Sequence, residues 1–151
     1  LQKETFELNP YLQKIIHKWE SNTDRKIIFS QGSEHLKLSA NASKLERVID
    51  NLISNALKFS AVDKEISVLA SKVKNKALIK VKDNGIGIPS ELQSHIFEQF
   101  SKASRKGLQG EKSIGLGLHI SHKIIEQHEG ELLVNSVENE GTTFTIQLPL
   151  V

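Results

Sequence analysis

The sequence predicts an α+β domain in which helices cover one face of a mixed, mostly antiparallel sheet. Strand-like and helix-like segments alternate irregularly, which disfavours a parallel sheet built from repeated strand-helix units. One segment has a strong helical period, and 151 residues with 38% hydrophobic content suit a single buried core. We therefore expect a two-layer sandwich with about three helices, forming one domain over residues 1–151.

The first third of the chain contains one expected helix and three expected strands. Residues 5–8 have strand character, and Pro10 is pre-organised for the first turn of a helix. Residues 26–30 and 35–39 have the composition of two further strands, separated by a turn around Gly32. We expect these two strands to pair as a hairpin.

The segment 43–59 has the clearest helical pattern. Its apolar residues recur with the spacing of an amphipathic helix over about four turns. They are Leu45, Val48, Ile49, Leu52, Ile53, Ala56 and Leu57.

The second half of the chain continues with strands, short helices and one long loop. Pro89 starts a short helix that we expect to reach Phe97, and residues 101–113 have no apolar periodicity and predict a loop. Helical spacing returns at 116–128, before Gly130. The expected strands are 65–71, 77–82, 131–137 and 142–148.

Composition excludes several classes of function. Twenty basic and 18 acidic residues nearly balance, so the whole chain carries no nucleic-acid footprint. No apolar run approaches the roughly 20 residues that cross a bilayer, so we expect no direct membrane contact. The absence of cysteine excludes disulfides and cysteine-based zinc sites and fits a cytoplasmic location.

A polar stripe runs along the expected helix 43–59. Asn51, Asn55 and Lys58 lie within about 60 degrees of one another on a helical wheel, and Arg47 shares their face. Amide oxygens and a cation on one stripe suit a magnesium-bound nucleotide. A solvated helix face with incidental asparagines is the alternative, although mid-helix asparagine costs helix propensity.

Two glycine motifs add to this stripe. Asp83 ends a strand and is followed by Gly85 and Gly87, which permit close backbone approach to a ligand, and its carboxylate can accept a hydrogen bond from an exocyclic amine. Gly115 and Gly117 open the helix 116–128, where unpaired N–H groups attract anions. Either motif alone could be an ordinary turn.

Further residues could complete a nucleotide site. The loop 101–113 carries Lys102, Arg105, Lys106 and Lys112 against the single acid Glu111, as a lid over a triphosphate would need. A charge cluster of this kind can equally be a solvated loop. Thr142 follows Gly141 at the start of the last strand and could donate to an adenine-side network.

Taken in order, five motifs closely resemble the boxes of the catalytic, ATP-binding domain of bacterial sensor histidine kinases, which has the Bergerat fold. The motifs are Asn51 to Phe59, Asp83 to Gly87, Phe97 to Phe100, Gly115 to Leu118 and Gly141 to Phe144. The resemblance spans essentially the whole chain. Two positions depart from the pattern: Gln99 stands where proline or arginine is frequent, and Asn41 replaces the usual aspartate before the long helix.

The resemblance implies a role for each matching residue. Asn55 would be the magnesium ligand, Asn51 and Lys58 would lie at the phosphates, and Asp83 would accept the adenine amino group. Asn51, Asn55 and Lys58 would form the catalytic set. The implied nucleotide contacts further include Phe59, Gly85, Gly87, Ile88, Lys102, Arg105, Gly115, Leu116, Gly117, Leu118 and Thr142.

The resemblance also implies the reaction and its partners. The domain would bind Mg²⁺ and ATP and transfer the γ-phosphate to a histidine on a separate dimerisation domain of a homodimeric kinase, with a response regulator downstream. An anti-sigma-type serine kinase and a gyrase-like ATPase module share the fold and remain alternatives, as does a degenerate domain that binds only a partner. The full-length protein could be a membrane-bound sensor with this part in the cytoplasm.

No histidine in the chain has the surroundings of the family's phospho-acceptor. His128, followed by Glu129, comes closest, but it lies at an expected helix end before Gly130. We therefore expect His128 to be structural or exposed, and the dimerisation domain to be absent from this chain. The domain would then need a partner for phosphoryl transfer.

Overall fold

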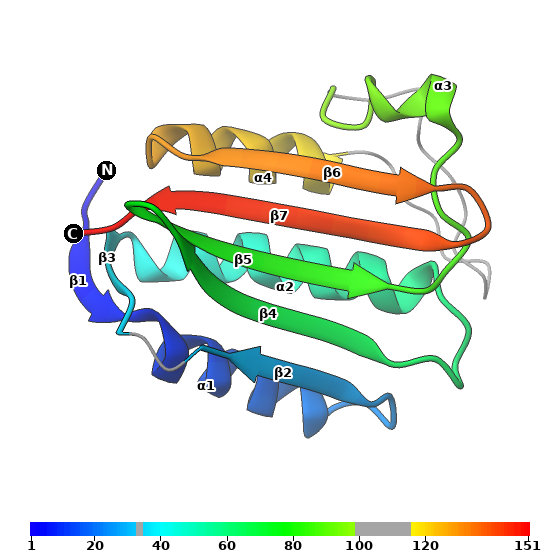
Figure 1. Cartoon of the computed structure of the whole chain (residues 1–151), viewed down its shortest axis with the longest axis horizontal. Helices are drawn as coiled ribbons and strands as arrows, with labels where there is room; N and C mark the ends of the chain where they lie inside the picture. The colour runs from blue at the N-terminus through cyan, green and yellow to red at the C-terminus, as the bar shows by residue number, and fades with distance from the viewer. Residues whose placement is uncertain (33–34, 99–115) are drawn as a thin grey trace.

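The computed structural model describes residues 1–32, 35–98 and 116–151. These residues form a two-layer α+β domain, with a sheet on one side and helices on the other (Figure 1). The five-stranded sheet has the order β2-β4-β5-β7-β6. Its strands are β2 (Ile27–Gln31), β4 (Ile66–Val73), β5 (Lys76–Asp83), β6 (Glu131–Val137) and β7 (Gly141–Pro149).

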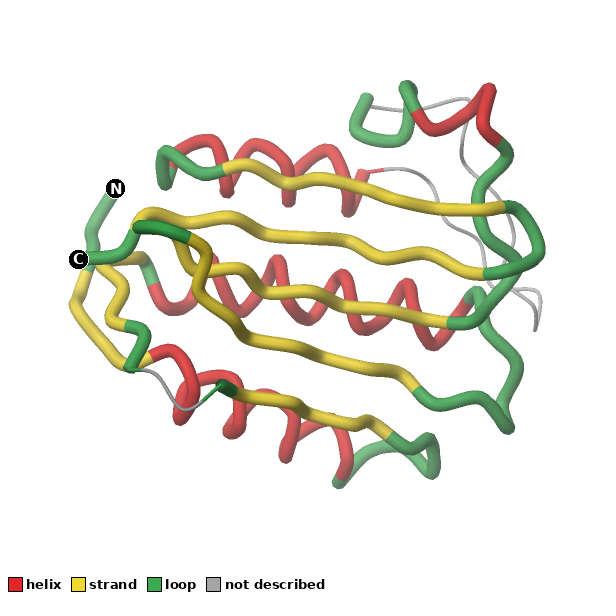
Figure 2. Tube along the Cα trace, viewed as in Figure 1, coloured by secondary structure: helices red, strands yellow, loops and turns green. Residues whose placement is uncertain are grey.

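Three helices lie against one face of this sheet, as the sequence predicts (Figure 2). They are α1 (Leu8–Glu20), α2 (Ala42–Lys58) and α4 (Leu116–Gln127). The central helix α2 lies between the other two, behind β4 and β5. The short α3 (Ser90–Gln93) lies beyond the end of the sheet. None of the helices in the described part of the chain is long and apolar enough to span a membrane.

The expected hairpin around Gly32 is wrong. β2 pairs in parallel with β4, with Ile27 opposite Ile66, whereas the following strand β3 (Lys37–Ala40) pairs antiparallel with β1 (Glu4–Glu7) in a separate two-stranded sheet. Alternating burial shows only that each segment is a strand, so local sequence does not reveal a partner about 35 residues away. The remaining pairs of the large sheet are antiparallel.

The short helix after Pro89 also ends earlier than expected. The α-helix stops at Gln93, and the chain continues to Glu98 in turns that include the bonds from His95 N to Leu92 O and from Glu98 N to His95 O. Tertiary packing explains the difference, because the Phe97 ring stacks on His122 of α4 and meets Phe144 of β7 edge-on. The chain leaves the α-helical conformation here, and its turns place the Phe97 ring against the core.

The apolar stripe of α2 forms the centre of the core. Six of its seven predicted apolar residues are buried, and only Leu57 remains half-buried. Each buried leucine, isoleucine or valine among them contributes roughly 1.5–3 kcal/mol relative to exposure. Asn41 caps the helix through its Oδ1, which accepts from Lys44 N at 2.9 Å. Its Nδ2 also donates to Gln2 O, a contact that an aspartate could not make.

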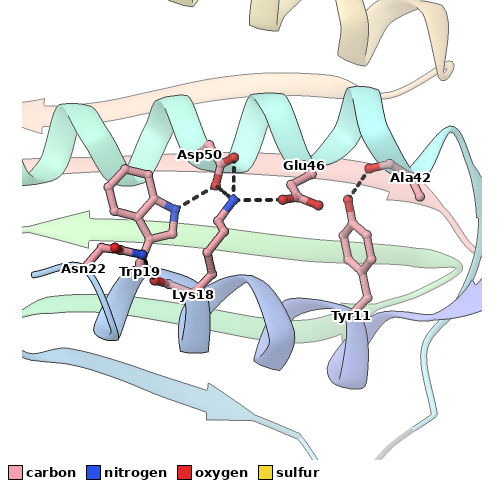
Figure 3. Close-up of polar contacts among 7 residues, drawn as sticks. All are labelled: Tyr11, Lys18, Trp19, Asn22, Ala42, Glu46 and Asp50. Carbon is pink, nitrogen blue, oxygen red and sulfur yellow. Dashed lines mark hydrogen bonds and ion pairs between the residues drawn. The ribbon is translucent and has the colours of Figure 1, made fainter.

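Polar contacts fasten α1 to α2 (Figure 3). Trp19 Nε1 donates to Asp50 Oδ1 at 2.7 Å, and Lys18 Nζ contacts both Asp50 and Glu46. Tyr11 donates its hydroxyl to the carbonyl of Ala42 at 2.6 Å. The Lys18 pairs are solvent-exposed and contribute little, so the partly buried Trp19 and Tyr11 bonds fix the two helices.

The Tyr11 contact makes stability depend on pH in the alkaline range. Burial, followed by the charges of Glu46, Asp50 and Glu4, raises the pKa of Tyr11 well above its usual value of 10.0. The folded protein therefore holds this proton more tightly than the unfolded chain. The resulting stabilisation is complete below pH 10 and is lost as the pH rises above it.

We expect Tyr11→Phe to lower the free energy of unfolding by about 1 kcal/mol at neutral pH, because the carbonyl of Ala42 loses its donor. Above pH 10 the difference from wild type should shrink, because only the wild type has a tyrosine to ionise. Urea unfolding followed by the fluorescence of Trp19, the single tryptophan, measures both quantities. A difference that grows with pH would contradict the assignment.

Candidate nucleotide-binding site

The helix-facing side of the sheet changes from apolar to polar at its last row. The successive rows from the other end are Ala77 and Leu148, then Ile79, Ile146 and Leu132, then Val81, Phe144 and Val134. The final row consists of Asp83, Thr142 and Ser136, which are directly opposite one another in register. Asp83 and Thr142 are buried, being 6% and 4% exposed. A polar row at the end of a core is costly unless its groups find partners.

The loop after Asp83 is seated against the end of α2. Ile86 N donates to the carbonyl of Phe59 at 3.0 Å, and a side chain at Gly85 would overlap this same carbonyl. Gly85 N donates to Asp83 Oδ1 at 2.8 Å, which orients the carboxylate. Phe59, predicted as a nucleotide contact, is buried and holds the loop through its backbone.

The other side of the loop rests on the turn between β6 and β7. Asn139 N donates to Ile86 O at 2.7 Å, and Ile88 N donates to Ser136 Oγ at 2.8 Å. Gly87 has a φ of 68°, and a side chain there would meet the backbone of Val137. The two glycines of the motif are therefore required by packing on both sides of the loop.

Arg25, which the sequence reasoning missed, supports the end of α2. Its guanidinium donates to Leu57 O, Ser60 Oγ and Lys64 O. Burial lowers the pKa of Arg25, and the nearby carboxylates of Asp63 and Asp83 oppose that effect. A cation at a helix C-terminus is favourable, but a lone Arg before a strand carries no sequence signal of this role.

The polar stripe of α2 meets the first turns of α4 at Asn51. Asn51 Nδ2 donates to the buried Ser121 Oγ at 3.2 Å. A side chain at Gly117 would lie 2.5 Å from Asn51 Oδ1, so only glycine fits there without displacement. The structure thus brings Asn51 of the polar stripe together with Gly117 of the second glycine motif. Ser121, one helical turn after Gly117, was not identified from sequence.

Asn55 and Lys58 follow Asn51 on the same stripe. Both are half-buried, whereas Arg47 is exposed. Lys58 lines a hollow of about 390 Å³ together with Arg25, Ser54 and residues of the α1–β2 turn. Lys58 therefore also borders the turn between α1 and β2.

Several predicted contacts cannot be placed. Lys102, Arg105 and Gly115, with the expected lid 101–113, lie outside the described residues, and only the backbone of Leu116 is described. Leu118 is half-buried on α4, and Ile88 is buried behind the Asp83 loop.

His128 is structural. Its Nδ1 lies 2.7 Å from Ile124 O, a carbonyl that can only accept, and its Nε2 accepts from Asn41 N at 3.0 Å. These two contacts require the neutral ring with its proton on Nδ1. The buried His128 therefore joins α4 to the start of α2 and is held away from solvent.

The donor set fits a magnesium-bound nucleotide. Within the described ranges, no group of three His, Cys, Asp or Glu side chains could hold a metal ion by itself. A half-buried asparagine instead offers one neutral oxygen, which suits an ion that also takes phosphate oxygens and water. Gly117, in the first turn of α4, is exposed and adds no side chain that would block an anion there.

Comparison with known proteins agrees with this geometry. Residues 40–151 match the family described as histidine kinase-, DNA gyrase B- and HSP90-like ATPase. The chain is 37% identical over 152 aligned residues to the sensor protein kinase WalK of Staphylococcus saprophyticus, covering 99% of this chain and 25% of that protein. It therefore spans about a quarter of the length of this relative.

Solved structures show the same fold. The nucleotide-free catalytic domain of the histidine kinase ThkA superposes with a TM-score of 0.85 at 27% identity, covering 99% of both chains. The histidine kinase domain of the Escherichia coli osmosensor EnvZ gives a TM-score of 0.76 at 26% identity, covering all of this chain and 91% of that one.

The chain therefore belongs to the histidine kinase-, DNA gyrase B- and HSP90-like ATPase family. Within that family it is homologous to the catalytic domains of two-component sensor histidine kinases.

The close contact of Gly117 with Asn51 can be tested by whether Gly117→Ala lowers or raises stability in two backgrounds. In the wild type, Gly117→Ala should destabilise the fold or displace Asn51, because the new methyl group meets the Asn51 amide. In an Asn51→Ala background the same change should stabilise by roughly 0.5–1 kcal/mol, the usual gain of alanine over glycine in a helix. Chemical denaturation of the wild type, the two single variants and the double variant gives the coupling energy between the two positions. An equal effect of Gly117→Ala in both backgrounds would refute the contact.

Proposed function

We propose that this chain is a single ATP-binding catalytic domain that binds Mg²⁺ and ATP and transfers the γ-phosphate to a histidine on a separate dimerisation domain. The observation that carries this proposal is the meeting of three motifs at one end of the molecule. The buried Asp83 row, the polar stripe of α2 and the glycine-bearing first turn of α4 converge there. Family membership supports the same activity.

Each group of residues has a proposed role. Asp83 accepts the amino group of adenine, with Thr142 beside it and Gly85, Gly87 and Ile88 shaping that end of the site. Asn55 provides the metal ligand, while Asn51 and Lys58 lie at the phosphates. Gly115 to Leu118 present backbone N–H groups to the phosphate oxygens, and Lys102 and Arg105 belong to the proposed lid.

The chemistry asks mainly for positioning and charge neutralisation. Magnesium, when bound with ATP, supplies positive charge that compensates the phosphate oxygens. The neutral imidazole of an acceptor histidine already has a nucleophilic nitrogen, so this domain need not supply a strong base. We expect slow ATP hydrolysis by the isolated chain and transfer only when the acceptor domain is present.

The proposed setting is a two-component pathway in the cytoplasm. The acceptor domain would belong to the same full-length kinase, which would be a homodimer, and a response regulator would take the phosphoryl group from the histidine. The relatives fit this view, because they are named sensor protein kinases and this chain covers a quarter of their length.

Replacing Asp83 by alanine should weaken ATP binding about ten- to a hundredfold, or roughly 1.5–3 kcal/mol, through loss of a charge-assisted hydrogen bond. Titration calorimetry with Mg-ATP measures this change. Asn84→Ala is the matched control, because Asn84 is the exposed neighbour in the same loop. Unchanged affinity in a folded Asp83→Ala protein would remove Asp83 from the base site.

Asn55→Ala should weaken Mg-ATP binding and leave magnesium-free ADP binding almost unchanged, because only the metal complex needs its amide oxygen. Ser54→Ala, the adjacent half-buried position on α2, controls for changes in the helix itself. Calorimetric titrations with and without magnesium give the comparison. Equal losses for both nucleotides would place Asn55 outside the metal site.

A further inference from the structure

Ser136 occupies the third place in the polar row that contains Asp83 and Thr142. Its hydroxyl meets three groups at once. Ile88 N donates to Ser136 Oγ at 2.8 Å, Gly141 O lies 3.0 Å from the same oxygen, and Thr142 Oγ1 lies 2.8 Å from it. No motif identified this residue, although its position opposite Thr142 follows from the pairing of β6 with β7.

These three contacts fix the direction of every hydrogen in the cluster. A carbonyl oxygen can only accept, so the single hydroxyl hydrogen of Ser136 goes to Gly141 O. The bond between the two hydroxyls must then be donated by Thr142. Ser136 consequently accepts two hydrogen bonds and donates one, which satisfies its full capacity.

The arrangement determines what Thr142 can offer to a ligand. Its only hydroxyl hydrogen is committed to Ser136, so Thr142 Oγ1 presents lone pairs alone. The expectation that Thr142 donates to a base is therefore reversed. Asp83 lies directly opposite Thr142 on β5, and a carboxylate also only accepts. At this end of the site, Thr142 Oγ1 and the Asp83 carboxylate therefore both act only as hydrogen-bond acceptors.

We propose that Ser136 is a specificity-determining positioning residue, which makes this end of the site select purine nucleotides with an amino group at C6 over those with an oxo group. This inference rests on the proposed function, since it assumes that the base lies at the Asp83 row. An amino group donates to both acceptors. An oxo group places a third acceptor against them, and no hydroxyl can turn to compensate because Ser136 holds it.

Ser136 also anchors the Asp83 loop, and the two effects can be separated. Gln93 Nε2 of α3 donates to both Ile88 O and Ser136 O at 2.9 Å. Gln93 therefore fastens the same loop without touching either hydroxyl. Loss of Gln93 loosens the loop and leaves the Thr142 hydrogen where it is, so Gln93→Ala is the matched control.

The test compares three nucleotides on each protein by titration calorimetry with magnesium. ATP carries the C6 amino group, purine riboside triphosphate carries only hydrogen there, and ITP carries the oxo group. The wild type should bind them in that order of decreasing affinity. In Ser136→Ala the Thr142 hydroxyl becomes free to turn and donate, so the preference for ATP over ITP should fall by about fivefold or more.

Gln93→Ala should lower the binding affinity for all three nucleotides by one common factor. If Ser136→Ala also weakens binding of all three nucleotides by one common factor, with the ATP to ITP ratio unchanged, the inference is overturned and Ser136 is only a loop anchor.

Thr142→Val gives a second test if Ser136→Ala does not fold. It removes the acceptor oxygen itself and should also reduce the ATP preference, whereas an unchanged ratio would overturn the inference.

The two levels of the proposal fail differently. A wild-type protein that binds no ATP would overturn both the proposed function and the role of Ser136. A wild-type protein that binds ATP and ITP with equal affinity would overturn the Ser136 inference and the assignment of Asp83 to the adenine amino group, and would leave the proposed ATP binding and phosphoryl transfer in place.

Discussion

The carbonyl of Phe59, the residue after α2, is the contact on which the geometry of the site depends. It accepts from Ile86 N and fills the space that a side chain at Gly85 would need. This contact sets the loop that follows Asp83 against the same helix that carries Asn51 and Asn55. Arg25 holds that helix end from the other side through Leu57 O and Ser60 Oγ. The Asp83 loop and the polar stripe of α2 are therefore fixed relative to one another by these contacts.

Helix α2 has three different surroundings. Its apolar face is buried in the core, Asp50 faces α1 through Trp19, and the polar stripe carries Asn55 and Asn51, of which Asn51 faces α4 through Ser121. Because neighbouring residues on a helix are about 100 degrees apart, positions 50 and 51 reach different partners. A small rotation of α2 would consequently disturb helix packing and the candidate site together.

The sequence predicted what depends on local periodicity and missed what depends on long-range pairing. The apolar and polar stripes of α2 follow from helical spacing, and the fold class follows from the irregular order of strands and helices. The partners of β2 and β3 do not, because strands of similar pattern can pair with any edge. Arg25 and Ser136 have no motif at all: their roles come from hydrogen bonds to Ser60, Lys64, Ile88 and Thr142, which only the folded chain brings within reach.

The two chain ends meet at one pole of the domain. β1 pairs with β3, and Val151 N donates to Lys37 O on the same strand, while Asp83 ends β5 at the opposite pole (Figure 1). If the domain is attached to a surface or to another protein through either chain end, the end of the domain that carries Asp83 therefore faces away from the attachment point. The domain can be immobilised on a sensor surface, or joined to a fluorescent reporter, by its first or last residues with the face that carries Asp83 left open to solution.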